Sequence, residues 1–499
     1  MHVGSGSNLT TTQRTDSQSS AAPARRDSKF AGKRVHFIGI GGSGMSGLAR
    51  MLLDNGAIVS GSEPKPSAVT FDLAKRGAKV SRDQLGELLS KDVDLVVRTA
   101  AVKDDNAEFA AARALGLAHV KYAQLLGQVM QERHGIAVAG THGKSTTTAM
   151  TAYALLQCGA DPSFVVGGTV PQLGGGSRSG AGTAFVAEAC EFDRSFHNLH
   201  PTVALLTNLE ADHLDCYKDL DDIVESFRAF ARLLPPTGTI VALGNDANVA
   251  RALDGVRCNV EYAVLSGAHG GAQASAAALD PSRLDATWTT VETGIVNGCH
   301  TGDVHHNGRT VASLKLAVAG RHNLINATMA IAACHTCGVS PADAAAALSS
   351  FTGVDRRMTE VGTYNGATVV DDYGHHPTEI RATLSALRER YRPERLVCVF
   401  QPHQHSRTRF LLDEFTTAFA AADETLVPEI YAVRDSEAER QKVSSAMLVE
   451  KVRAAGSNAV HLPTFAAIVD RLRRTVQPGD LVVTMGAGNV WEIGRDLVG

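Results

Sequence analysis

Residue types that bind phosphate stand together between Gly140 and Ser145, in the run Gly-Thr-His-Gly-Lys-Ser. The run ends as nucleotide-binding P-loops end, with a lysine that neutralises charge on the β- and γ-phosphates and a serine hydroxyl that coordinates Mg²⁺. It is shorter than the general P-loop, because Val138 stands where the first glycine is expected. A lysine at a helix N-terminus opposes the helix dipole unless an anion lies there, which argues against a turn without a ligand. These residues predict an ATP site and favour ATP chemistry over redox chemistry.

A second glycine-rich loop lies near the N-terminus. Gly39, Gly41 and Gly44 fit the pattern GxGxxG, directly after one predicted strand and before a predicted helix. Glycines let backbone N–H groups and a helix N-terminus approach a pyrophosphate closely. Glu63 follows about twenty residues later, where dinucleotide-binding folds place a ribose-binding acid. A nicotinamide dehydrogenase is therefore one alternative, and a tight turn without a ligand is another.

Acidic, histidine and asparagine side chains follow other predicted strands. Glu188 ends a strand, and His213 stands in an acidic turn, where the alternative to a ligand role is an ordinary hydrogen-bonded histidine. His322 and Asn326 are four residues apart and can share a helix face. Asparagine amides suit the donor and acceptor edges of a nucleotide base, although Asn323 can equally cap the helix.

The elements that must position these residues repeat the order strand, glycine turn, helix, which is typical of parallel α/β folds. The predicted strands are 34–40, 57–60, 136–139, 184–188, 202–207, 311–319, 368–371, 395–400 and 480–484. The predicted helices are 45–55, 145–158 and 323–337, and a further Ala-rich helix has Ser340 as its N-cap and Pro341 in its first turn. Residues 266–310 carry no pattern that assigns them, and a domain boundary is expected at 352–357.

Length and charge limit the class of protein. A chain of 499 residues is too long for one hydrophobic core, so two to four domains are expected. The 48 basic and 52 acidic residues nearly balance, which does not indicate a nucleic-acid partner. No uncharged apolar run is long enough to span a bilayer, so membrane insertion is not expected.

The N-terminus and the cysteines indicate the compartment. Residues 1–30 lack the continuous apolar core of a signal peptide and are interpreted as a disordered tail, so a cytoplasmic location is expected. The chain has eight scattered cysteines, which fits a reducing compartment. Cys334 and Cys337 form a CxxC inside a helical run with no second pair to complete a zinc site, and we expect them to pack in that helix.

Six motifs together resemble the Mur ligase family, in its branch that adds L-alanine. They are AVAGTHGKSTTT (137–148), GIGGSGMSG (39–47), TNLEADHLD (207–215), GRHNLINA (320–327), DDYGHHPTE (371–379) and QPHQHSRTR (401–409). The matches extend from about residue 35 to 490 and appear in the family's order. Two residues and one short segment depart from the family pattern, namely Glu63 in place of Asp, His405 in place of an aromatic residue, and Arg98-Thr99-Ala100 in place of Ser-Ser-Ala.

The resemblance implies an α/β enzyme of three domains. A Rossmann-like domain at 31–133 would bind a UDP-sugar, so the first glycine loop would hold its diphosphate and not NAD. A central P-loop-type domain with a parallel-rich sheet at 134–353 would bind ATP, and a Rossmann-like domain at 354–499 would bring the amino acid and part of the ATP site. The implied reaction joins L-alanine to the lactyl carboxylate of UDP-N-acetylmuramate through an acyl phosphate, converting ATP to ADP and phosphate. A ligase that attaches a preformed peptide to the same UDP-sugar, and a nucleotide-binding regulator without catalysis, stay as alternatives, and the oligomeric state stays open.

The resemblance also implies residue roles. The UDP-sugar would contact Gly39, Gly41, Gly42, Ser43, Gly44, Met45, Ser46, Glu63 and Thr99. ATP would contact Gly140, Thr141, His142, Gly143, Lys144, Ser145, Thr146, His322, Asn323, Asn326, Arg357, Asp372 and Tyr373. Mg²⁺ or Mn²⁺ would be held by Ser145, Glu188 and His213, and catalysis would use Lys144, Glu188, His213, Arg357, His375 and Arg407. The histidines His375, His376, His403 and His405 stand beside tight turns at Pro377 and Pro402, and we expect the alanine and the reacting phosphate there, not a separate metal site.

Overall fold

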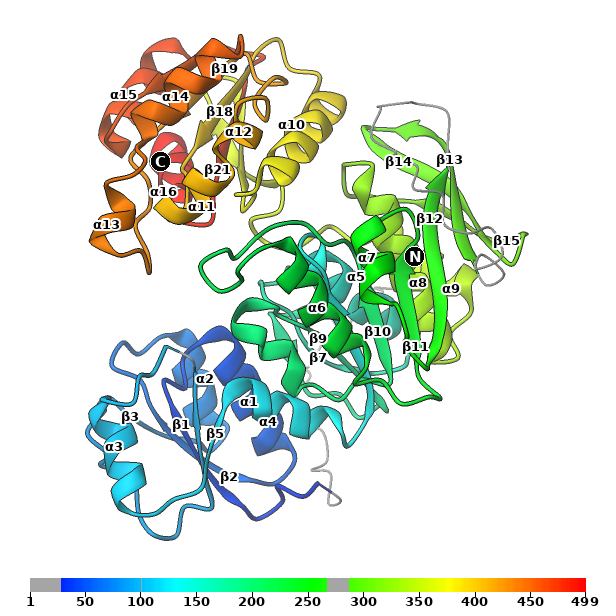
Figure 1. The fold of residues 1–499 in the computed structure, drawn as a ribbon, viewed down its shortest axis with the longest axis vertical. Coiled ribbons are helices and arrows are strands. Elements are labelled where there is room, and N and C mark those ends of the chain that lie inside the picture. The colour runs from blue at the N-terminus through cyan, green and yellow to red at the C-terminus, as the bar shows by residue number, and fades with distance from the viewer. Residues whose placement is uncertain (1–27, 100, 267–286) are drawn as a thin grey trace, which may run out of the picture.

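The structure is a computed structural model that describes residues 28–99, 101–266 and 287–499. Three α/β units follow one another along the chain, coloured from blue through green to red in Figure 1. The tail predicted at residues 1–30 lies outside the described residues except for its last three, and Phe30 is already buried in the core. None of the helices in the described ranges is long and apolar enough to cross a membrane.

The N-terminal unit is built on a five-stranded parallel sheet in the order β3-β2-β1-β4-β5. Its strands are β1 (Arg34–Ile38), β2 (Ile58–Ser62), β3 (Lys79–Ser81), β4 (Leu95–Arg98) and β5 (His119–Lys121). Its helices are α1 (Ser43–Asp54), α2 (Ala68–Lys75), α3 (Ala107–Ala114) and α4 (Tyr122–Met130). Because β1 pairs with β2 on one side and β4 on the other, the first glycine loop leaves the sheet where the strand order reverses, the usual ligand position in open α/β sheets.

The middle unit contains a ten-stranded sheet in the order β15-β14-β13-β12-β11-β10-β6-β9-β7-β8. Its strands are β6 (His134–Ala139), β7 (Ser163–Val165), β8 (Ser177–Arg178), β9 (Ala184–Glu188), β10 (Val203–Leu206), β11 (Thr239–Leu243), β12 (Asn259–Ser266), β13 (Thr287–Val296), β14 (Cys299–His306) and β15 (Arg309–Lys315). Its helices are α5 (Lys144–Gln157), α6 (Leu220–Ala231), α7 (Ala247–Ala252), α8 (His322–Thr336) and α9 (Pro341–Leu348), with 3₁₀ turns η1 (Pro171–Leu173) and η2 (Phe192–Asn198). The strands from β12 to β7 run parallel, as expected for this domain.

Three antiparallel-linked strands occupy the stretch that the sequence pattern left unassigned. β13 continues the parallel sheet beside β12, and β14 and β15 then turn back as hairpins. The fully buried Trp288 anchors β13, whereas the opposite ends of the hairpins are polar and partly exposed. The predicted strand 311–319 begins and ends earlier, as β15, and residues 267–286 lie outside the described part of the chain.

The C-terminal unit has a six-stranded sheet in the order β16-β17-β21-β18-β19-β20, parallel except for β16. Its strands are β16 (Thr359–Tyr364), β17 (Ala367–Asp372), β18 (Leu396–Phe400), β19 (Glu424–Val427), β20 (Ala459–His461) and β21 (Leu481–Met485). Its helices are α10 (Pro377–Tyr391), α11 (His405–Phe410), α12 (Leu412–Phe415), α13 (Glu437–Arg440), α14 (Ser445–Ala454), α15 (Phe465–Thr475) and α16 (Trp491–Val498).

Local signals behave as predicted. The Ser340 hydroxyl accepts a hydrogen bond from the Asp343 N–H at 3.1 Å, so it caps α9 with Pro341 in the first turn. Cys334 is buried inside α8 and Cys337 ends that helix, and both are free thiols, as expected for packing residues. The three-domain α/β architecture is confirmed, and the domain boundaries stay a prediction.

The N-terminal and middle units share a hydrophobic core, whereas the C-terminal unit has cores of its own. One continuous apolar cluster joins the N-terminal unit to one face of the middle sheet, from Val35 and Leu126 to Phe196 and Phe227. The two apolar clusters of the C-terminal unit contain no residue of the other units. Contacts between the C-terminal unit and the middle unit include the ion pairs Arg407–Asp212 and His142–Glu379.

Candidate active site

The strand order of the middle sheet brings three predicted segments to one edge. β6 lies between β9 and β10, and all three run parallel. The P-loop follows β6, Glu188 ends β9, and the segment 207–213 follows β10. Because parallel strands end on the same side of the sheet, these residues converge at a point where the strand order reverses.

The P-loop is held in shape by its neighbour after β10. The Asn208 side-chain oxygen accepts a hydrogen bond from the His142 N–H at 2.8 Å, and the Thr207 hydroxyl donates to the His142 carbonyl at 2.6 Å. Gly140 has φ +140°, and a β-carbon there would overlap the Thr207 hydroxyl. Gly143 has φ +81° directly before α5, so both glycines are required by the turn.

Lys144 folds back onto its own loop. Its ammonium donates to the carbonyl oxygens of Gly140 at 2.6 Å and Thr141 at 2.9 Å, and to the Glu191 carboxylate at 2.8 Å. An ammonium has three N–H donors, so this conformation satisfies all of them without a phosphate.

Glu191 is a site residue that sequence reasoning missed. It is 4% exposed, and its Oε1 atom lies 3.5 Å from His213 Nε2. His213 itself has φ +52°, an uncommon conformation for a non-glycine residue that is often held at functional sites. Burial alone would raise the pKa of Glu191, but Lys144 and His213 together outweigh it and lower that pKa. The only sequence signal was its position three residues after Glu188, in EACEFD.

The donor set at this edge fits a divalent cation. Glu191 Oε2 and His213 Nδ1 are buried and have no hydrogen-bond partner among the described residues. Glu188 lines the same cavity, where its carboxylate accepts a hydrogen bond from the Gly167 N–H at 2.7 Å. Carboxylate and hydroxyl oxygens with one imidazole suit Mg²⁺ or Mn²⁺.

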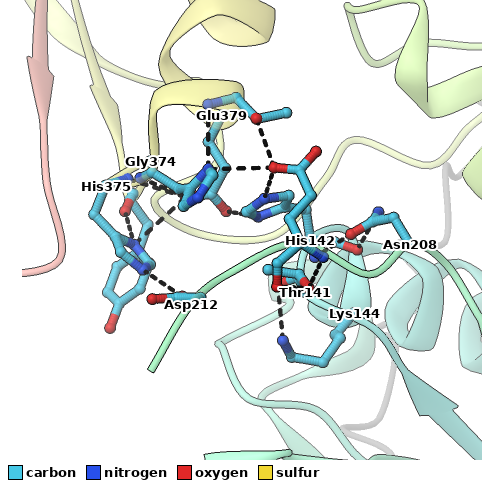
Figure 2. A network of polar contacts seen from close by, with 12 residues as sticks. Thr141, His142, Lys144, Asn208, Asp212, Gly374, His375 and Glu379 are labelled. Atoms are coloured by element: carbon cyan, nitrogen blue, oxygen red, sulfur yellow. Dashed lines mark hydrogen bonds and ion pairs between the residues drawn. The ribbon is translucent and has the colours of Figure 1, made fainter. Parts of the chain in front are cut away.

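The C-terminal unit contributes charged groups to the opposite side of the site. Arg407 is buried and donates to the Asp212 carboxylate at 2.8 Å, while His375 lies 3.9 Å from the same carboxylate. Arg357 donates to Glu379 at 3.4 Å. Figure 2 shows His375 and Glu379 facing Asp212 and the P-loop across the boundary between the units.

His142 bridges the two units directly. Its Nε2 atom lies 3.3 Å from Glu210 and its Nδ1 atom 3.4 Å from Glu379, which lies in the first turn of α10 (Figure 2). Burial alone would lower the pKa of His142, but the two carboxylates outweigh it and raise the pKa to about 9. His142 is therefore a cation at neutral pH.

His376 and Glu210 lie close to His142, and the three could in principle hold a metal ion. Their atoms are already bonded, however. The Thr378 N–H donates to His376 Nδ1 at 3.2 Å, and the Thr378 hydroxyl donates to Glu210 at 2.7 Å. The Thr378 N–H bond to His376 is part of a capping box at the start of α10.

Two adjoining cavities contain most of the predicted ATP and catalytic residues. The first, of about 430 Å³, is lined by Thr141, His142, Gly143, Lys144, Ser145, Glu188, His213, Arg357, Tyr373, His375 and Arg407. The second, of about 270 Å³, is lined by His142, Gly143, Ser145, Thr146, His322, Asn323, Asn326, Arg357 and Asp372. Gly140, the first residue of the loop, lines neither cavity. The unpredicted residues Glu191, Asp212, Glu210 and Glu379 also line these cavities.

The second cavity is lined by two asparagines whose side chains are held by hydrogen bonds. The Asn326 amide donates to the Asn323 oxygen at 3.0 Å, and the Asn323 amide donates to the Ala319 carbonyl at 2.6 Å, so the two amides are held in fixed orientations. Burial lowers the pKa of His322 to about 4, so its ring is neutral. Asp372 accepts hydrogen bonds from the Met358 and Gly374 N–H groups at 2.9 and 2.7 Å and thereby orders the junction between the units.

The predicted UDP-sugar residues form a separate group in the N-terminal unit and line neither cavity. The Gly41 N–H donates to the Glu63 carboxylate at 3.2 Å, so Glu63 lies against the glycine loop. A β-carbon on Gly44 would come within 2.6 Å of the Tyr122 hydroxyl. Met45 and Ser46 are buried in α1, and Thr99 follows the end of β4.

A buried pair beneath this loop was not foreseen. His36 and Glu108 are fully buried, with His36 Nε2 2.9 Å from the Glu108 carboxylate. Glu108 also accepts from the Ser62 hydroxyl at 2.5 Å, and the Ser62 carbonyl accepts from the Gly39 and Ile40 N–H groups. The pair thus fixes the strand end that shapes the glycine loop.

Comparisons with known proteins agree with this architecture. Three family models match successive parts of the chain: the Mur ligase family catalytic domain at residues 34–134, the Mur ligase middle domain at 138–334, and the Mur ligase glutamate ligase domain at 356–488. The UDP-N-acetylmuramate–L-alanine ligase of Acetivibrio thermocellus is 42% identical over 465 residues, covering 93% of this chain and 95% of that protein. The corresponding ligase of Caldanaerobacter subterraneus is 40% identical over 93% of this chain and 97% of its own.

Solved structures give the same result. The UDP-N-acetylmuramate–alanine ligase of Thermotoga maritima matches with a TM-score of 0.72 and 27% identity over 93% of this chain and 98% of that one. A murein peptide ligase of Psychrobacter arcticus matches with a TM-score of 0.66 and 28% identity over 93% of this chain and 98% of that one. The resemblance predicted from the sequence motifs is thereby confirmed. The chain belongs to the Mur ligase family and is an ATP-dependent ligase.

Proposed function

We propose that this protein joins L-alanine to the lactyl carboxylate of UDP-N-acetylmuramate, with conversion of ATP to ADP and phosphate, in cytoplasmic synthesis of a peptidoglycan precursor. Relatives about 40% identical over 93% of the chain carry this activity in their names. The observation that carries the proposal is one cavity lined by Lys144 and Ser145 from the middle unit and by Arg357, His375 and Arg407 from the C-terminal side.

The first chemical step transfers a phosphoryl group. A lactyl carboxylate oxygen attacks the γ-phosphorus of ATP, the bond to the β-phosphate oxygen breaks, and an acyl phosphate and ADP form. Lys144 and Arg357 neutralise charge on the phosphate oxygens during this transfer. Mg²⁺, when bound by Ser145, Glu188 and His213, supplies further positive charge to those oxygens.

The second step forms the amide. The uncharged amine of L-alanine attacks the acyl carbon, phosphate leaves, and the amine loses a proton. We assign Arg407 to the charge that develops on the leaving phosphate, because its guanidinium is buried at the cavity wall. His375 lies on the same side and is our candidate to receive the proton.

We further assign ATP to the two adjoining cavities, with its base near His322, Asn323 and Asn326. The UDP-sugar is assigned to the glycine loop of residues 31–133, and the amino acid to residues 354–499. The glycine loop leaves the N-terminal sheet where the strand order reverses, and this position supports the assignment of the UDP-sugar.

Phosphate release tests the proposal. Release from ATP should require Mg²⁺, UDP-N-acetylmuramate and L-alanine together, and Lys144→Ala should reduce it by at least about a hundredfold, the usual cost of losing one transition-state charge contact. Release without L-alanine would contradict the proposal.

A second candidate attaches a preformed peptide to the same UDP-sugar, as the similarity to a murein peptide ligase suggests. Comparing free L-alanine with a tripeptide that begins in L-alanine decides between them. Product from the tripeptide alone would overturn the L-alanine assignment.

A further inference from the structure

Glu191 is a buried carboxylate that lines the first cavity, and none of the roles assigned to Lys144, Glu188 and His213 accounts for it. It lies in the turn after β9, where the Tyr217 hydroxyl donates to its backbone carbonyl and fixes the main chain. One carboxylate oxygen contacts Lys144 at 2.8 Å and His213 at 3.5 Å. The other oxygen is buried without a hydrogen-bond partner in the described part of the chain.

A carboxylate buried to this extent needs a positive partner, and in this structure the partner is Lys144. ATP binding changes that balance. Once the Lys144 ammonium turns toward the phosphates, Glu191 loses its counter-charge while the negative γ-phosphate arrives close by. The Glu191 carboxylate and the γ-phosphate would then repel each other strongly, because both are negative and the site is buried. A second cation must therefore replace the lysine.

The residues beside Glu191 can hold that cation. Glu188, Glu191 and His213 all line the same cavity, and Glu191 Oε1 lies 3.5 Å from His213 Nε2. Resting on the function proposed above, we propose that Glu191 exchanges partners: it holds Lys144 when the nucleotide is absent, and it joins Glu188 and His213 in holding the divalent cation when ATP is bound. Lys144 and the metal ion therefore compete for one carboxylate, and the exchange couples metal binding to nucleotide binding.

The competition predicts that loss of the Glu191 charge strengthens nucleotide binding without a metal ion and weakens the effect of the metal ion on it. Without a divalent cation, Glu191→Gln should bind a non-hydrolysable ATP analogue about tenfold more tightly than wild type, because the charge that holds Lys144 and repels phosphate is gone. With Mg²⁺ present, the gain in affinity that the metal gives should shrink by about tenfold. Asp193→Asn is the matched control, since Asp193 stands two residues from Glu191 but forms its ion pair with Lys121, and neither residue lines the two cavities. It should leave the metal-dependent gain unchanged.

The competition between Lys144 and the metal ion can also be tested without nucleotide. Electron paramagnetic resonance measures the affinity for Mn²⁺. Lys144→Ala should bind Mn²⁺ more tightly than wild type, because the competing ammonium is absent, and adding Glu191→Gln should remove that gain. If Glu191→Gln does not fold, the comparison of Lys144→Ala with wild type still decides. Unchanged or weaker Mn²⁺ binding by Lys144→Ala, or equal analogue affinities without metal, would overturn the exchange.

These titrations use neither L-alanine nor UDP-sugar, so their failure is distinct from that of the proposed function. Alanine-independent phosphate release with normal partner exchange would reject only the reaction. A normal ligase that lacks the predicted metal coupling would reject only the role of Glu191.

Discussion

At the scale of single residues, His142 carries the contact between the P-loop and the C-terminal unit. Its pKa is raised from 6.5 to about 9, so its contribution to stability is complete below pH 6.5 and disappears as the pH rises through about 9. The shift corresponds to an upper limit of about 3 kcal/mol. We expect the wild type to lose thermal stability between these pH values and His142→Gln to lose much less.

Melting temperatures of the wild type and His142→Gln, measured between about pH 6 and pH 10, give the difference in pH dependence. This range includes both the ordinary and the raised histidine pKa. His461→Gln is a suitable control, because His461 forms an exposed ion pair with Glu429. Parallel pH profiles for wild type and His142→Gln would show that the bridge does not contribute.

The residues that sequence reasoning found and those it missed differ in a physical way. Lys144 and Ser145 begin α5 after a glycine loop, and Glu188 ends β9, so their chemistry can be read from the local pattern. Glu191, Glu210 and Glu379 contact Lys144, Thr378 and His142, which are far away in the chain, and the local sequence carries no sign of such partners. Asp212 stayed unassigned for the same reason, because its partner Arg407 is 195 residues away.

At the scale of elements, the contact between α4 and η2 depends on Gly127. A β-carbon there would collide with the Asn198 carbonyl oxygen. Gly127→Ala should therefore destabilise the protein by about 1–3 kcal/mol through overpacking. Gly494 is the matched control, since it is also a buried helical glycine but its β-carbon would stand 3.4 Å from its nearest neighbour.

Urea unfolding of both variants tests this contact. Gly494→Ala should be neutral or more stable by up to about 1 kcal/mol, because alanine favours helix. Equal stability of Gly127→Ala and wild type would mean that α4 can move away from η2 without cost.

A second element contact joins α10 to the β13–β14 hairpin. The buried His300 on β14 lies 2.6 Å from Glu292 and 2.9 Å from Glu389 near the end of α10. His300→Gln should weaken this attachment and speed amide hydrogen exchange at the C-terminal end of α10, with little change in the helices of the N-terminal unit. Uniform exchange throughout the molecule would instead indicate general destabilisation.

Elements differed in how well sequence predicted them. The central strands β6, β9 and β18 are buried on both faces and read as short apolar runs with glycine turns or helices after them. The hairpins from β13 to β15 mix histidine, threonine and glycine with few apolar residues, because one side of them is partly exposed. Their pairing is set by neighbours in the sheet, which local patterns do not contain.

At the scale of the whole molecule, the site lies between the middle and C-terminal units, which ion pairs such as Arg407–Asp212 and His142–Glu379 connect. The junction carries strained backbone, with φ +62° at Arg356 and +51° at Met358, and Arg357 between them lines both cavities. Because the proposed ATP contacts come from both units, we expect closure on ligand binding.

Small-angle X-ray scattering measures this closure. The radius of gyration should fall when an ATP analogue and UDP-N-acetylmuramate are both bound, and fall less with either alone. No compaction with both ligands would reject closure.

The apolar cluster shared by the N-terminal and middle units has a calorimetric consequence. Units that share one core cannot lose it separately, so the first two should melt in a single cooperative transition, while the C-terminal unit melts in its own. Because melting enthalpy scales with chain length, the larger transition should absorb roughly twice the heat of the smaller. Differential scanning calorimetry should therefore resolve two transitions. The three structural domains would then unfold as two cooperative units.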